Sequence, residues 1–262
     1  MKKTQPINAE KNLVRVMSSN TLALASDKDT TIPKKIRMTS LCAHYLTYQP
    51  DLLGLQEVQV DVKEHIVSLL SDVYTMVNVD TGGRKNHTPM FYKTEALELL
   101  HSKYFTFLEG GVWHCEWALY RRKSDSKRLI HMNLHYHYNS INERLPEAKL
   151  VNAELKELER LYPDAAIFVT GDYNCETFTP EFEAMLDGLE MNSGMLLTDD
   201  NDGIEVGWHH PDTTDYAGPG AIDHIAVTYK KAKVVRHRKI KSELLTYSTD
   251  HDPIYIDAEL IP

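Results

Sequence analysis

Acidic, amide and histidine side chains recur in this sequence at the ends of short apolar segments. The clearest case is "AIFVTGDYN", residues 166–174, where a run of core-type residues ends in Asp172 and Asn174. Side chains two apart in a strand share one face of a sheet, so these two point the same way. Polar groups at such a position cost desolvation free energy unless they are paired or bind something. One such strand end needs no functional explanation.

The same feature occurs at five further places in the chain. These ends carry Asn20; Gln56 and Glu57; Asn133, His135 and His137; Asp223 and His224; and Asp250 and His251. Six ends of this kind predict strands that converge on one cleft. Carboxylate and amide oxygens suit Mg²⁺ or Mn²⁺, and a histidine beside an acid makes an oriented acid–base pair. A metal ion with such pairs is what in-line attack on a phosphorus centre requires.

Length and composition favour one globular domain. The chain has 262 residues, of which 42% are hydrophobic, and no linker or low-complexity tract interrupts it. We expect a polar tail at residues 1–12 and a single domain at 13–262. Three widely spaced cysteines form no disulfide framework, and no apolar signal or membrane-length segment is present. These features predict a cytoplasmic protein without a membrane span.

Strands outnumber helices in the hydrophobic pattern. We expect helices at 32–49, 60–70, 143–162 and 180–186, the third with a leucine stripe of Leu150, Leu155, Leu158 and Leu161. Strands are expected at 13–20, 51–57, 73–79, 88–93, 97–107, 114–122, 128–137, 165–174, 221–229, 233–240 and 252–260. Several strands follow one another directly, which excludes a purely parallel sheet. The pattern therefore predicts an α+β fold in which two sheets pack together with helices outside.

Six short motifs, in order, make a family recognisable. "SSN", "LLGLQEV", "NLH", "GDYN", "IDHI" and "TDHDPI" resemble the endonuclease/exonuclease/phosphatase superfamily, whose members include deoxyribonucleases, sphingomyelinases, inositol polyphosphate phosphatases and deadenylases. The resemblance extends from Val14 to Leu260. It implies a four-layer α/β/β/α sandwich of two mixed, mainly antiparallel sheets, and a divalent-metal site, for Mg²⁺ or Mn²⁺, at one end of the sheets.

The resemblance also implies metal-binding residues. Glu57 takes the place of the main metal ligand, Asn20 helps to hold the metal and the phosphate, and Asp250 lies beside the metal.

The catalytic roles that the resemblance implies fall on two acids, an amide and two histidines. Asp172 orients or deprotonates the attacking water, with Asn174 supporting it and contacting the phosphate. His135 polarises the phosphate or protonates the leaving group. Asp223 orients His251, which stabilises the charge of the transition state or acts as acid and base.

Three positions depart from the usual pattern of the superfamily. Tyr173 replaces a common Phe, "NLHYH" replaces "NTHL", and His224 stands where Tyr or Trp is more usual. Because it neighbours Asp223 in a strand, His224 should point away from that acid. Its role is left open, as are those of His209 and His210.

Four further residues are candidates for substrate contact. They are Arg84 and Asn86, in a Gly-containing loop, and His137 and Arg144, near the start of a helix. A solvated turn, a surface histidine and a salt bridge are the alternative readings. The one basic run, residues 229–241, alternates with apolar residues and is read as an edge strand with a solvated face.

The sequence therefore predicts a metal-dependent phosphoesterase that acts by in-line attack of an activated water. A net charge of −9 disfavours an extended nucleic-acid surface, so a small or lipid-derived phosphate ester is the preferred substrate. A nuclease acting on DNA or RNA is the alternative, and a catalytically silent binding module is a third reading. No obligate protein partner is evident.

Overall fold

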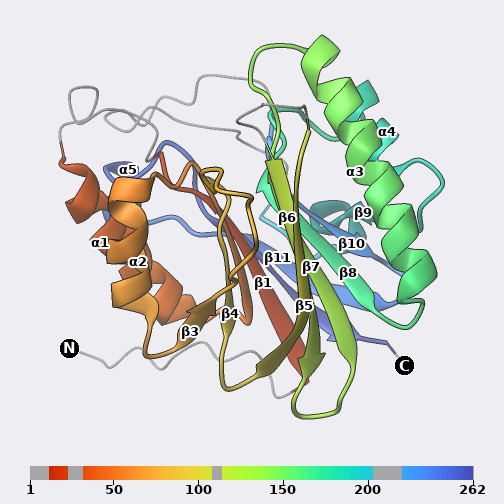
Figure 1. The fold of residues 1–262 in the computed structure, drawn as a ribbon, viewed down its shortest axis with the longest axis horizontal. Coiled ribbons are helices and arrows are strands. Elements are labelled where there is room, and N and C mark those ends of the chain that lie inside the picture. Colours follow the sequence, from red (N-terminus) through yellow and green to blue (C-terminus); the bar gives the residue numbers. More distant parts are fainter. Residues whose placement is uncertain (1–11, 23–31, 108–113, 203–219, 262) are drawn as a thin grey trace.

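The chain folds into two six-stranded sheets between layers of helices (Figure 1). The computed structural model describes residues 12–22, 32–107, 114–202 and 220–261. The first sheet has the order β11 (Ala232–Lys239), β12 (Ile254–Leu260), β1 (Leu13–Asn20), β2 (Leu52–Gln56), β4 (Met90–Lys93) and β3 (Tyr74–Met76). The second has the order β5 (Leu97–Thr106), β6 (His114–Arg122), β7 (Arg128–His135), β8 (Ala166–Asp172), β10 (Asp223–Thr228) and β9 (Met191–Ser193).

The helices cover the outer faces of the two sheets. Helices α1 (Lys34–Tyr48), α2 (Val60–Leu70) and α5 (Glu243–Thr246) lie on the side of the first sheet, and α3 (Ile141–Leu161) and α4 (Pro180–Leu186) on that of the second (Figure 1). A 3₁₀ helix, η1 (Gly194–Leu197), follows β9. None of the helices in the described ranges is long and apolar enough to cross a membrane.

Three apolar cores correspond to the three interfaces of a four-layer sandwich. Met38 and Ile66 pack against Leu53 between the first helical layer and its sheet. Val16 and Phe168 belong to the middle core, between the sheets. A third core joins α3 and α4 to the second sheet, with residues such as Val151, Met185 and Ile130. The predicted α/β/β/α sandwich is confirmed.

Two strand–helix–strand units bring the polar strand ends together. In the first, β1 and β2 are parallel, which places Asn20 opposite Gln56. In the second, β7 and β8 are parallel, and His135 lies opposite Asp172. The carboxyl ends of parallel strands meet at one edge of a sheet, so each unit delivers its polar residues to the same edge. Antiparallel β10 begins at that edge, with Asp223 opposite Asp172.

The predicted leucine stripe of the third helix was half wrong. Leu155 and Leu158 are buried as expected, but Leu150 and Leu161 are 44% and 46% exposed. Ala148 and Val151 occupy the buried face instead. Positions 148, 151, 155 and 158 follow the 3.6-residue period of a helix, which turns Leu150 and Leu161 to the flank. The short elements β9, η1 and α5 were not predicted.

The basic run forms an edge strand, as expected. β11 lies at one end of the first sheet. Its arginines face acids: Arg236 is 3.4 Å from Asp257, and Arg238 pairs with Asp200. Two of the positive charges of this strand, those of Arg236 and Arg238, are therefore paired with acids within the protein.

A buried polar network crosses the middle core just before Glu57. Gln56 Nε2 and the Thr170 hydroxyl donate to Asn133 Oδ1 at 2.7 and 2.8 Å. His131 Nε2 lies 2.8 Å from the Thr170 hydroxyl, and burial lowers the pKa of His131 to about 3, so this ring is neutral. The network fixes the spacing of the two sheets beside the polar strand ends.

Gly54 leaves the space that this network needs, and its replacement should destabilise the protein. A Cβ at this position would lie 2.2 Å from Thr170 Oγ1 and 2.5 Å from Asn133 Oδ1. We expect Gly54→Ala to lower the free energy of unfolding in urea by roughly 1–3 kcal/mol. The matched control is Ser68→Ala on the exposed face of α2, which should change it by less than about 0.5 kcal/mol. Equal stabilities for the two variants would contradict the proposed crowding.

Candidate active site

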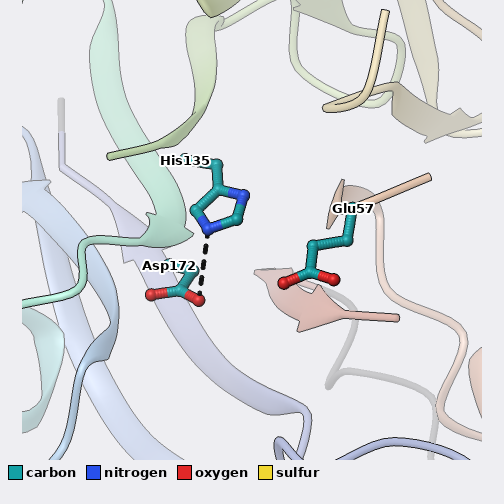
Figure 2. A group of neighbouring side chains, drawn as sticks. All are labelled: Glu57, His135 and Asp172. Atoms are coloured by element: carbon teal, nitrogen blue, oxygen red, sulfur yellow. Dashed lines mark ion pairs between the residues drawn. The ribbon is translucent and has the colours of Figure 1, made fainter. Parts of the chain in front are cut away.

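Glu57 projects from the end of β2 toward the second sheet. Figure 2 shows its carboxylate directed at the space in front of His135 and Asp172, which come from β7 and β8. The backbone of Glu57 is left-handed, with φ 61°, a conformation that is uncommon for a residue with a side chain. Such outliers concentrate at functional sites, where the surrounding structure holds them in place.

Asp172 lies at the centre of the group. Its Oδ1 accepts the backbone N–H of Asn174 at 2.9 Å, and its Oδ2 accepts the amide of Asn20 at 2.9 Å. His135 Nε2 is 3.5 Å from the same Oδ2 (Figure 2). Asn174 donates its own amide to the backbone oxygen of Tyr136 at 2.9 Å, which ties the loops after β7 and β8 together. Asp172 is thereby held in one orientation.

Asn20 connects acids from the two sheets. Its Nδ2 donates to Glu57 Oε1 at 3.1 Å and to Asp172 Oδ2 at 2.9 Å. Its Oδ1 accepts the backbone N–H of Leu22 at 3.0 Å. In this arrangement Asn20 orients the two carboxylates through its NH₂ group. Metal ligation through its oxygen stays a prediction.

Asp223 and His251 form a short buried pair. His251 Nδ1 lies 2.6 Å from Asp223 Oδ2, and the two residues are 6% and 9% exposed. Burial opposes the charge of His251, but Asp223 and Asp172 outweigh it and raise the pKa of the ring well above its ordinary value. Burial raises the pKa of Asp223 to about 6, against the effect of His251. The imidazolium therefore donates from Nδ1 to Asp223 and directs Nε2 to Asp172 and Asp250, 3.8 and 3.9 Å away.

The donor set fits a divalent cation. Ligand atoms of Glu57, His135 and Asp172 all lie within 4.8 Å of one another. Asp250 Oδ1 is buried without a hydrogen-bond partner among the described residues, and burial followed by the nearby Glu57 raises the pKa of this acid. Hard carboxylate oxygens with unused acceptor capacity suit Mg²⁺ or Mn²⁺.

Proteins of known structure share this architecture. No family model and no curated protein matches the sequence. The endonuclease/exonuclease/phosphatase from Bacteroides vulgatus superimposes with a TM-score of 0.83 at 21% identity, over 96% of this chain and 100% of that one. The mannosyl-6-phosphatase of Bacteroides thetaiotaomicron gives 0.80 at 21%, over 94% and 99%. TDP2 from D. rerio, complexed with a single-strand DNA product, gives 0.75 at 17%, over 95% and 99%.

The chain has the endonuclease/exonuclease/phosphatase fold. The expected superfamily architecture is thereby confirmed. TM-scores of 0.75 to 0.83 show the fold at identities of 17 to 21%, and the chemistry of this particular chain depends on its own side chains.

Within this fold, two residues that sequence reasoning missed hold the site together. The Thr249 hydroxyl donates to the backbone oxygen of Asn20 at 2.8 Å and accepts the N–H of His251 at 3.2 Å. Arg37, fully buried on α1, donates to the backbone oxygens of Leu22 and Ser248 at 3.2 and 3.0 Å. Both residues join the ends of β1 and the segment before β12. Only the short spacing of Thr249 and His251 is visible in the sequence.

The structure distributes the four predicted substrate residues over different environments. Asn86 is buried and donates to Glu116 at 2.7 Å. Arg144 pairs with Glu181 at 2.8 Å, and His137 lies 2.9 Å from Glu143. The contacts of Arg144 and His137 match the salt bridge and the surface histidine that the sequence left open as alternatives, whereas a buried Asn86 does not match a solvated turn. Arg84 is exposed, and its guanidinium donates a hydrogen bond to a neutral group, the Thr106 hydroxyl, at 2.9 Å.

His224 has a packing role. It is buried against Tyr173 and Phe182, and its Nε2 lies 2.9 Å from the backbone oxygen of Cys175. Burial lowers its pKa to about 4, so the ring is neutral. It faces away from the acids, as the alternation along the strand predicts. His209 and His210 lie outside the described residues.

The Asp223 carboxylate should control the charge of His251. In metal-free protein, Asp223→Asn removes the closest anion, and we expect the pKa of His251 to fall. NMR titration of the imidazole protons measures it, with the exposed His101 as an internal control that should not change. An unaltered His251 pKa would show that the two residues are not electrostatically coupled.

Proposed function

We propose that this protein is a hydrolase that cleaves a phosphate ester with a bound Mg²⁺ or Mn²⁺. One observation carries the proposal: carboxylates from both sheets and an aspartate–histidine pair meet at a single point. A structural cluster would pair each acid with a cation. Here four acids, Glu57, Asp172, Asp223 and Asp250, gather around His251 and the amide of Asn20.

Asp172 is suited to act on the attacking water. Asn20 and the backbone of Asn174 fix its carboxylate, so that a water within hydrogen-bond reach is oriented as well. An acceptor held in this way takes the proton of that water as the new bond to phosphorus forms.

The two histidines supply hydrogen-bond donors to the phosphate. His251, kept charged by Asp223, has Nε2–H directed into the cluster, where it stabilises the negative charge that grows on the phosphate oxygens. His135 Nε2 lies 3.5 Å from Asp172 Oδ2, the oxygen that His251 Nε2 also faces at 3.8 Å. We assign His135 the protonation or polarisation of the leaving group.

Glu57 and Asp250, with Asp172, are the residues that would hold the metal. When bound, the ion polarises the phosphate and neutralises its charge. In this role the negative charge of the Glu57 side chain matters more than its size, because the charge attracts the cation.

We favour a small or lipid-derived phosphate ester over a nucleic acid. The chain carries a net charge of −9, and the arginines of its basic strand are paired with acids. An extended polyanion needs several uncompensated cations for binding. The similar mannosyl-6-phosphatase is consistent with a sugar phosphate, whereas the TDP2 complex with single-strand DNA is the basis for the alternative, a nuclease.

A substrate panel tests this preference. We expect higher kcat/KM for sugar, inositol or nucleotide phosphates than for plasmid, abasic or single-stranded DNA, at matched Mg²⁺ and low salt. Activity should disappear in EDTA and return with Mg²⁺ or Mn²⁺. DNA cleavage that exceeds every small ester and falls steeply with salt would support the nuclease, and full turnover in EDTA would refute metal dependence.

Glu57→Gln should nearly abolish activity while the fold survives. The glutamine keeps the size of the side chain and its bond from Asn20, but it loses the charge that attracts the cation. We expect kcat/KM to fall by roughly a hundredfold or more, as for other lost charge-stabilising groups. Glu95→Gln, which changes an exposed acid that pairs with Lys93, is the control and should leave activity unchanged. A fully active Glu57→Gln variant at saturating metal would exclude this role.

A further inference from the structure

Another buried acid, Glu116, lies outside the cluster described above. It belongs to β6, is fully buried, and is opposite Asn133 in the neighbouring strand. Its Oε1 accepts the backbone N–H of Met90 at 2.7 Å, and its Oε2 accepts the amide of Asn86 at 2.7 Å. Burial raises its pKa to about 8, yet both oxygens face N–H donors, an arrangement that only the carboxylate satisfies completely.

The segment that Glu116 holds, residues 86–90, surrounds Glu57 on both sides. The N–H of Leu55 donates to the backbone oxygen of Pro89 at 3.1 Å, and the N–H of Val58 to that of His87 at 3.0 Å. His87 Nδ1 lies 2.9 Å from the backbone oxygen of Val58, which completes a reciprocal contact. Gln56 and Glu57 thus lie between two tethers to one segment.

The ordinary sheet ladder reaches only the last residue of this segment, Met90. Paired positions of β2 and β4 end at Gly54 and Met90. Beyond them, residues 86–89 are fixed by side chains of the second sheet: Asn133 donates to the backbone oxygen of Thr88 at 2.9 Å, and Glu116 holds Asn86. The left-handed turn at Glu57 therefore depends on contacts from across the sandwich.

We propose that Glu116 is a positioning residue for Glu57, acting through residues 86–90. It touches neither the substrate nor the metal. It fixes the segment to which the backbone on either side of Glu57 is bonded, and so sets where the Glu57 carboxylate lies relative to Asp172. This inference rests on the proposed function, in which Glu57 holds the metal.

The test measures metal binding directly, without substrate. Electron paramagnetic resonance of free Mn²⁺ gives the Kd for the wild type and for Glu116→Ala, Glu116→Gln and Asn86→Ala. Glu116→Ala removes both hydrogen bonds, and we expect its Kd to rise about 10–100-fold, the usual range for groups that orient a metal ligand. Glu116→Gln keeps one accepting oxygen and should give a smaller rise, as should Asn86→Ala.

Asp257→Asn is the matched control. Asp257 is also a buried acid with two short contacts, to Arg15, but it lies toward the start of β1, away from Asn20. It should lower the thermal stability and leave the Mn²⁺ Kd unchanged. A role of Glu116 limited to stability predicts the same behaviour for Glu116→Ala.

The outcomes separate this inference from the proposed function. Wild-type protein that binds Mn²⁺ and hydrolyses a phosphate ester, with Glu116 variants that bind Mn²⁺ equally tightly, overturns the positioning role alone. Wild-type protein that binds no Mn²⁺ overturns both. If Glu116→Ala does not fold, Glu116→Gln and Asn86→Ala decide, and an unchanged Kd in both refutes the role.

Discussion

Repulsion between buried carboxylates is the constraint on which this structure depends. Asp172 and Asp250 each oppose ionisation of Asp223, and Glu57 and Asp172 oppose that of Asp250, in addition to the effect of burial. The protein offsets part of this cost with the imidazolium of His251, the amide of Asn20 and the N–H of Asn174. A divalent cation would offset more of it, so the crowding that costs stability without metal would favour the binding of such an ion.

The crowding requires two sheets, because no single strand end supplies all the acids. Glu57 follows a strand of the first sheet, whereas Asp172 and Asp223 belong to the second. Their approach is fixed by the polar network of Gln56, Asn133 and Thr170, which crosses the middle core next to them. Packing of the interior therefore determines the geometry of the site, because a change in the spacing of the sheets moves the acids.

The acids of the site and their chemistry could be predicted from the sequence, but the residues that position these acids could not. Asp172 and Asn174 were visible because a polar pair interrupts an apolar strand, and the two strand–helix–strand units place such ends at one edge. The role of Glu116 could not be predicted from the sequence, because its partners, Asn86 and Met90, meet it only when the two sheets pack together. Leu150 and Leu161 were misplaced because a leucine pattern does not fix the rotation of a helix to within one residue.

The fold does not choose the substrate, since solved structures with this architecture include a mannosyl-6-phosphatase and a TDP2 complexed with single-strand DNA. Which substrate is bound depends on the side chains around the strand ends where the site lies. In this chain Arg144, a candidate for substrate contact, is paired with Glu181. Arg238, in the basic run, is paired with Asp200. We propose Arg84, whose hydrogen-bond partner is the neutral Thr106 hydroxyl, as a cation for the substrate phosphate. One such cation is enough for a single phosphate group, whereas a nucleic-acid backbone is held by contacts repeated along its length.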